Sequence, residues 1–217
     1  MADRRQPQGA GLRDEAAGLP VIERRMLHAG KVFDLVAEQV DLGAGGVVDR
    51  EFLAHPGAVA IVALDEADRV ALVRQYRHPV RAYLWEVPAG LLDVRGESMV
   101  DAARRELAEE ADLVAGRWHT LVDFATTPGG SDERIRIFLA RDLSPVPEAD
   151  RYQREAEELG MPLRWVPLDE AFAAVLSGRL HNPSAVTGIL AAHAARASGW
   201  RTLRPAGAPL HLIPHSR

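Results

Sequence analysis

Cysteine is absent from the sequence of 217 residues. Disulfide bonds, catalysis by a thiolate and zinc held by cysteine are therefore excluded. Lysine is almost absent as well, because Lys31 is the only one and arginine supplies the other cations. Covalent chemistry at a lysine amine consequently has almost no candidate in this chain.

Long apolar segments are also missing. No run approaches the roughly 18 residues that cross a bilayer, and the first stretch of the chain lacks the apolar core of a signal peptide. The formal net charge is −5, so the negatively charged surfaces of nucleic acids and membranes would not attract the protein. We therefore expect neither as a partner, and we expect the protein to work in the cytoplasm.

Several catalytic signatures are absent too. The histidines are scattered along the chain without an H-E-x-x-H spacing, which argues against a zinc hydrolase. Neither a G-x-S-x-G motif nor a Walker-type phosphate loop is present, which argues against a serine hydrolase and a P-loop enzyme.

Four stretches can be distinguished along the chain. Residues 1–19 are expected to be a flexible leader, and residues 20–56 contain short strands that we expect to form a small antiparallel sheet of their own. Residues 57–200 form the main unit, and residues 201–217 form an irregular tail. About five to eight strands, one internal helix and a helical C-terminal third predict an α/β or α+β sandwich with a mixed sheet.

Two elements of the main unit are predicted in more detail. The apolar runs "AVAIVAL" and "RVALVRQ" flank the turn residues "DEAD" and predict a hairpin over residues 58–75. A helix is expected to begin at Ser98, which with Asp101 forms a weak capping box. Its apolar stripe, at spacings of three and four, consists of Val100, Ala103, Leu107, Ala111 and Val114.

Three glutamates crowd one edge of this helix. Glu106 and Glu110 lie about 40° apart around the helix axis, and Glu109 lies about 60° from Glu106. Two unit charges about 5 Å apart repel by roughly 3 kcal/mol at an effective dielectric constant of about 20. A divalent cation with a preference for oxygen ligands, Mg²⁺ or Mn²⁺, would turn this repulsion into attraction. The alternative is a solvated helix face neutralised by Arg104 and Arg105.

The residues around this helix resemble the Nudix box, the signature of a family of hydrolases that act on nucleoside diphosphates linked to another group. The box reads Gly, five residues, Glu, seven residues, then Arg-Glu-apolar-x-Glu-Glu-x-Gly-apolar. Gly90, Glu97, the run RELAEE at 105–110 and Leu113 match it. One extra residue separates Gly90 from Glu97, and Asp112 replaces the last glycine, which commonly ends the helix in a left-handed conformation. Aspartate tolerates that conformation better than most residues.

The resemblance implies a fold and a role for each matching residue. The fold is a mixed sheet sandwiched between helices. Arg105 would orient the carboxylates through charge-assisted hydrogen bonds, and Glu109 would be a further ligand or an acid behind the ligands. The ligands of two or three Mg²⁺ or Mn²⁺ ions would be Glu106, Glu110, Glu97 and the main-chain carbonyl of Ala89.

Beyond the box, the chain is similar to the ADP-ribose pyrophosphatase branch of the family over about residues 30–197. The similarity rests on "VRQYR", "LWEVPAG" and the proline of "TTPGG". In that branch the N-terminal strands are commonly exchanged between two subunits, so the resemblance implies a homodimer with a shared site.

The same branch implies the substrate contacts. Phe33 would stack on the adenine, Arg50 would reach the partner's site, Arg77 would contact the pyrophosphate and Glu86 the nucleoside side, with Pro128 nearby. Taken alone, Phe33 is equally well a core or interface residue, Arg50 a charge at a strand edge and Pro128 a turn residue.

A base that activates water is expected on the acidic stretch "YQREAEELGMP". Glu155 is the preferred candidate, Glu157 is an alternative base or an extra metal ligand, and Glu158 is a third candidate. The alternative is an acidic linker without a catalytic role. The resemblance thus implies metal-dependent hydrolysis of ADP-ribose to AMP and ribose 5-phosphate. Hydrolysis of another sugar nucleotide such as GDP-mannose, or nucleotide binding by an inactive Nudix sensor, are the alternative functions.

Overall fold

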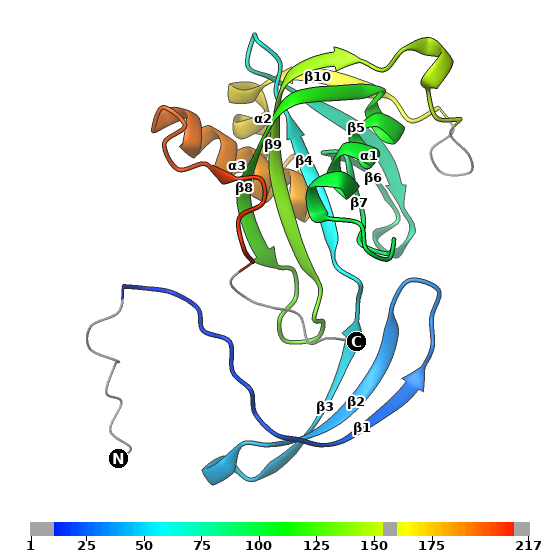
Figure 1. Cartoon of the computed structure of the whole chain (residues 1–217), viewed down its shortest axis with the longest axis vertical. Coiled ribbons are helices and arrows are strands. Elements are labelled where there is room, and N and C mark those ends of the chain that lie inside the picture. Colours follow the sequence, from blue (N-terminus) through cyan, green and yellow to red (C-terminus); the bar gives the residue numbers. More distant parts are fainter. Residues whose placement is uncertain (1–10, 154–159, 211–217) are drawn as a thin grey trace.

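The N-terminal strands form a sheet of their own. The computed structural model describes residues 11–153 and 160–210. Its first three strands, β1 (Val21–His28), β2 (Asp34–Asp41) and β3 (Val47–Ala54), are antiparallel and lie in the order β1-β2-β3. Figure 1 shows this sheet apart from the rest of the molecule, which the chain reaches by running directly from β3 into β4. The expected small antiparallel sheet is confirmed.

A mixed five-stranded sheet forms the centre of the main unit. Its order is β11-β8-β9-β4-β7, and β4 runs parallel to β9 while the other pairs are antiparallel. The strands are β4 (Ala58–Ala63), β7 (Ala89–Leu91), β8 (Leu113–Ala125), β9 (Arg134–Pro145) and β11 (Arg204–Pro205). This sheet is the mixed sheet that the sequence predicts.

Helices cover both faces of the central sheet. On β4, Val59 and Ile61 pack in a cluster with Leu107 of α1 (Met99–Ala111). The alternate β4 residues pack against α2 (Leu168–Leu176) and α3 (Pro183–Ala197), where Val62 and Ile189 belong to one cluster. All of β4 is buried, which explains why its sequence is a continuous apolar run instead of an alternating one. The expected sandwich of a mixed sheet between helices is therefore confirmed.

The predicted hairpin is correct as a turn and wrong as a strand pair. Asp65 and Asp68 do form a tight turn, but the two runs meet only in one bridge between Leu64 and Val70. Strand β5 (Arg69–Arg77) instead lies at the centre of a separate sheet, between β6 (Ala82–Glu86) and β10 (Leu163–Pro167). All of β4 and the segment Val70–Val73 of β5 are apolar and buried on both faces, so each prefers neighbours that cover it on both sides, and sequence proximity does not decide the pairing.

Helix α1 begins as the sequence predicts and ends at the position where the Nudix box has its last glycine. The side chain of Ser98 accepts a hydrogen bond from the backbone N–H of Asp101. Asp112 caps the other end in the left-handed conformation, with φ of 54°. The expected stripe is wrong at its last member, because the helix stops at Ala111 and Val114 lies in β8, where its side chain is exposed.

The remaining elements complete the two sheets. Short 3-10 helices occur at Gly43–Gly45, His78–Val80 and Glu148–Asp150. Eleven strands occur in the described ranges, more than the five to eight expected, because several strands are too short to produce a periodic signal. No helix in these ranges is long and apolar enough to span a bilayer.

A buried arginine fixes the described part of the C-terminal tail, residues 201–210, which the sequence predicts to be irregular. Arg136 of β9 is only 4% exposed and forms a two-pronged ion pair with Asp123 of β8. It also donates to the carbonyls of Ala208 and Pro209, while Arg204 contacts the same aspartate at 3.0 Å. Burial raises the pKa of Asp123, but hydrogen bonds and charge from Arg136 and Arg204 outweigh burial, so its pKa lies below the ordinary value.

We expect Arg136→Met to lower the free energy of unfolding by about 3 kcal/mol, since breaking a buried pair costs about 3–5 kcal/mol and Arg204 still faces Asp123. Chemical denaturation at pH 7 measures this change. Arg117→Met is the matched control, because Arg117 forms the same two-pronged pair with Asp142 on the surface and should cost at most about 1 kcal/mol. Equal losses of unfolding free energy in the two variants would contradict a stabilising role of the buried pair between Arg136 and Asp123.

Candidate active site

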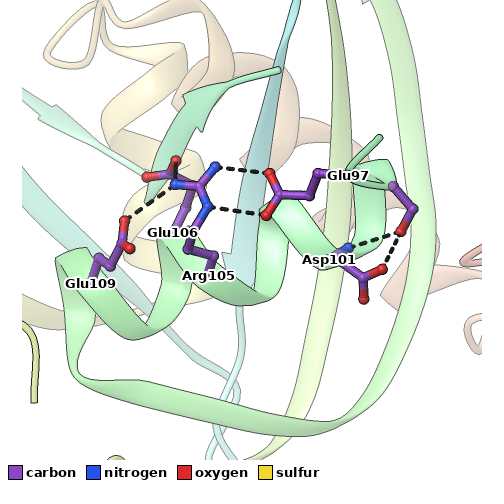
Figure 2. A network of polar contacts seen from close by, with 6 residues as sticks. Glu97, Asp101, Arg105, Glu106 and Glu109 are labelled. Carbon is purple, nitrogen blue, oxygen red and sulfur yellow. Dashed lines mark hydrogen bonds and ion pairs between the residues drawn. The ribbon is translucent and has the colours of Figure 1, made fainter. Parts of the chain in front are cut away.

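The acidic helix lies unusually close to the strand in front of it. Gly90, in β7, faces Glu106 of α1, and a Cβ placed on Gly90 would lie 1.9 Å from the carboxyl carbon of Glu106. Only glycine leaves room for this carboxylate. The loop between β7 and α1 contains the extra residue of the box, and it still places Glu97 beside the helix (Figure 2).

Arg105 holds three carboxylates together. Figure 2 shows its guanidinium between Glu97, Glu106 and Glu109. It donates to both oxygens of Glu97 at 3.1 and 3.0 Å, to Glu106, and to Glu109 at 3.2 Å. The hydrogen bonds of Glu97 and the charge of Glu106 raise the pKa of Arg105, although burial acts in the opposite direction. This geometry agrees with the orienting role that the resemblance implies for Arg105.

Glu110 is held separately from the other acids. It is only 8% exposed, and its carboxylate accepts a hydrogen bond from the backbone N–H of Ala89 at 3.0 Å. The carboxylates of Glu106 and Glu110 therefore both lie against β7, which also carries the carbonyl of Ala89. The predicted residues of the box thus converge on one edge of the central sheet.

The acidic edge is not a simple solvated helix face. Arg104, which would neutralise the glutamates on such a face, instead contacts Asp101 at 2.8 Å on the exposed side of the helix. Arg105 does neutralise the cluster, but it does so from a half-buried position at the edge of the sheet. The cluster therefore consists of partly enclosed oxygen atoms around one guanidinium.

The residues fit a divalent cation by type and by proximity. Carboxylates and a backbone carbonyl are the ligands that Mg²⁺ and Mn²⁺ prefer. Because Gly90 has no side chain, the carboxylate of Glu106 can lie against β7. In residues 11–153 and 160–210, however, no three His, Asp or Glu side chains are arranged as a ready set of ligands. The carboxylates point at Arg105 and at the N–H of Ala89, so an ion would take over some of these contacts.

Two residues predicted to contact the substrate contact each other. The guanidinium of Arg77, at the end of β5, donates to one oxygen of Glu86 at 2.9 Å and to the other at 2.7 Å. Glu86 ends β6 and is almost completely buried, whereas Arg77 is partly exposed. The sequence pattern identified both residues but gave no sign of this pair.

Two of the other predicted substrate residues line a separate cleft. Arg50 and Pro128 line a cleft of about 740 Å³ between the N-terminal sheet and the loop that joins β8 to β9, together with residues such as Arg24 and Arg134. Phe33 precedes β2 and has an exposed side chain. Among the described residues, the lining of this cleft does not include the carboxylates of the box.

The loop that carries Pro128 is fastened to the end of β3, a connection that the sequence did not suggest. Leu53 donates to the carbonyl of Gly130 and accepts from the N–H of Asp132. The carboxylate of Asp132 then accepts a 2.7 Å hydrogen bond from the N–H of His55. These partners lie more than seventy residues apart in the chain, so no local pattern could reveal them.

The three candidates for the catalytic base cannot be placed. Glu155, Glu157 and Glu158 lie outside the described residues. Their roles therefore stay predictions.

Comparison with known proteins identifies the family. The model of the NUDIX domain matches residues 54–185, which is more than half of the chain and contains every element of the site around α1. The protein therefore belongs to the Nudix family, whose members generally use divalent metal ions.

The relatives are similar over most of their length. The ADP-ribose pyrophosphatase of Mycobacterium tuberculosis is 45% identical over 85% of this chain and 87% of its own. The ADP-ribose pyrophosphatase of Bacillus subtilis is 38% identical over 63% of this chain and 71% of its own. A methanol dehydrogenase activator of Bacillus methanolicus is 33% identical over 77% of this chain and 89% of its own.

A solved structure supports the fold. The crystal structure of an ADP compounds hydrolase superposes with a TM-score of 0.70, covering 86% of this chain and 99% of that chain. Its sequence identity is 21%, so the likeness concerns the architecture of the two chains.

We expect Gly90→Ala to displace the carboxylate of Glu106, because the added methyl would overlap it. The Mn²⁺ concentration that half-saturates the protein, measured by electron paramagnetic resonance, should then be about 10- to 100-fold higher than for the unaltered protein. A loss of this size is typical of removing a group that supports a metal site. Gly207→Ala is the control, since a Cβ there meets nothing within 4 Å. Unchanged Mn²⁺ affinity in Gly90→Ala would exclude Glu106 as a ligand.

Proposed function

We propose that this protein hydrolyses the pyrophosphate bond of ADP-ribose to AMP and ribose 5-phosphate. The observation that carries the proposal is the 45% identity to an ADP-ribose pyrophosphatase over 85% of the chain. The gathered carboxylates at Gly90 support a working hydrolase instead of an inactive sensor, because a sensor has no need to keep this costly cluster of charges.

The residues of the box would divide the work as follows. Glu106, Glu110, Glu97 and the carbonyl of Ala89 would hold Mg²⁺ or Mn²⁺, in two or three sites. A bound divalent ion supplies charge neutralisation on the phosphates and a water of lowered pKa. Arg105 keeps the carboxylates in register until the ion binds, and Glu109, one turn from it, supports the same cluster.

Substrate recognition would use residues outside the box. The guanidinium of Arg77 would bind the pyrophosphate, because a planar cation with several donors suits phosphate oxygens. The exposed ring of Phe33 would stack on the adenine. Arg50, whose guanidinium donates to the carbonyl of Asp49, would reach the substrate, with Pro128 shaping the loop.

We further propose that the site is completed in a homodimer. In the described part of this chain, the box and the cleft with Arg50 have separate linings, which a second subunit could bring together. The N-terminal sheet also exposes apolar side chains, among them Ile22, Met26 and Leu27. Burial of such side chains favours association. The cytoplasmic location expected from the sequence stays a prediction.

A second candidate substrate is another nucleoside diphosphate or monophosphate derivative. A hydrolase of a CMP-linked phosphonate from Streptomyces rubellomurinus is 32% identical over 77% of this chain. Likeness at this level therefore spans more than one nucleotide, and the residues of the box do not select the base.

We expect purified protein with ADP-ribose and Mg²⁺ to release AMP and ribose 5-phosphate in equal amounts, as followed by chromatography. Glu106→Gln, prepared in the same way, should release none, which excludes a contaminating hydrolase. Tight binding of ADP-ribose without AMP would favour the sensor. Faster cleavage of GDP-mannose or of a CMP derivative would move the assignment to that substrate.

For the base, we expect Glu155→Gln to lower kcat by about 10²- to 10⁴-fold, the usual contribution of a general base, while Mn²⁺ binding is retained. Glu148→Gln is the matched control, since Glu148 lies in the 3-10 helix just before the same stretch. Turnover of Glu155→Gln near that of the unaltered protein would transfer the role to Glu157 or Glu158.

A further inference from the structure

Glu86 is a buried acid whose predicted role does not match its surroundings. The resemblance implies that it contacts the nucleoside side of the substrate. Its side chain is only 3% exposed, and both of its oxygens accept hydrogen bonds from Arg77. An ionised carboxylate at this depth is stable only when it is paired, so contact with a nucleoside would require this pair to open.

The register of the strands shows how far Arg77 reaches to make the pair. Glu86 stands opposite Val73, whereas Arg77 stands opposite Ala82, at the other end of the same ladder. The Arg77 side chain therefore lies back along the sheet instead of extending from the strand end into solvent. An unpaired arginine would populate many rotamers, at a cost in entropy whenever a ligand orders it.

The pair lies on the side of the sheet that carries the box. Residues opposite one another in an antiparallel ladder share a face, so Arg77 and Glu86 share the face of Ala71. Ala71 packs in the cluster that includes Leu107 of α1. Arg77 and Glu86 thus lie on the face of their sheet that, at Ala71, packs against α1.

Glu86 is also connected to the box through a short, fixed segment. Pro88 accepts a 2.8 Å hydrogen bond from the N–H of Ile61 in β4. Ala89, three residues after Glu86, donates to Glu110 and pairs with Ala60. The short segment that begins at Glu86, the partner of Arg77, therefore also carries Ala89, a predicted metal ligand. This connection fixes the guanidinium relative to the carboxylates.

We propose that Glu86 is a positioning residue that aims Arg77 at the pyrophosphate, and that it does not itself contact the nucleoside. The proposal rests on the proposed function, in which Arg77 binds the diphosphate. Because the fork of hydrogen bonds already orders the guanidinium, the substrate meets a cation in its binding conformation, and less entropy is lost when the substrate binds.

A double-mutant cycle tests the proposal. Glu86→Gln, Arg77→Ala and the double variant are made in the full chain, and kcat and KM for ADP-ribose are measured with Mg²⁺. We expect each single variant to raise KM about 10- to 100-fold, the range for a hydrogen bond to a charged group. The double variant should resemble Arg77→Ala alone, because Glu86 acts through Arg77. A double variant whose rise in KM equals the product of the two single rises would overturn the proposal.

Two further variants distinguish positioning from a purely structural role of Glu86. Arg77→Lys keeps the charge but loses the fork, so it should behave like Glu86→Gln; KM near that of the unaltered protein would overturn the proposal, even if Glu86→Gln failed to fold. Asp142→Asn is the matched control, because it breaks a two-pronged arginine pair on the surface and should leave KM unchanged. Thermal unfolding of each variant reports loss of structure.

Binding without turnover distinguishes this proposal from the proposed function. The same proteins are titrated with ADP-ribose in the presence of EDTA, and Kd is measured by calorimetry. If the unaltered protein binds ADP-ribose in EDTA but does not cleave it when Mg²⁺ is supplied, the proposed hydrolysis fails, and the cycle in Kd still decides the role of Glu86. If the unaltered protein cleaves ADP-ribose and the cycle is additive, only the positioning role fails. Neither binding nor cleavage of ADP-ribose would overturn both.

Discussion

The guanidinium of Arg105 is the interaction on which the site depends. Glu97, Glu106 and Glu109 all lie within reach of its donors, and without a cation their charges would drive the loop before α1 away from the helix. Gly90 adds the second constraint, because the absence of a side chain lets Glu106 approach β7. Helix and loop are thus linked by ion pairs in addition to apolar packing, which explains how an acidic cluster can be compatible with a stable fold.

Local features of this structure were predictable from the sequence, and long-range partners were not. The start of α1 at Ser98 and its left-handed end at Asp112 follow from capping chemistry that operates within a few residues. The partners of β4 and β5 could not be predicted, because the apolar β4 and the apolar first half of β5 fit any covered position in a sheet. For the site, the motif identified Arg77 and Glu86 individually, but their pairing depends on a strand register that no spacing in the sequence specifies.

The separation of the predicted metal-site residues from two of the predicted substrate residues has a physical meaning. Arg105, Glu106 and Glu110 belong to the edge of the central sheet, whereas Arg50 and Pro128 line the cleft beside the N-terminal sheet. The loop with Pro128 is hydrogen-bonded to the end of β3, through Leu53 and Asp132. Movement of that loop therefore cannot be independent of movement of the N-terminal sheet, so any ligand that orders one also biases the other.

The parallel pair of β4 and β9 has a consequence for the newly made protein. Ala58 pairs with Ile135, and the whole acidic helix lies between them in the chain. During translation the helix is complete before the strand that closes the sheet beneath it has left the ribosome, a delay of about 2–7 s at about 5–20 residues per second. Throughout that interval the apolar side of α1 is a surface on which chaperones or proteases can act.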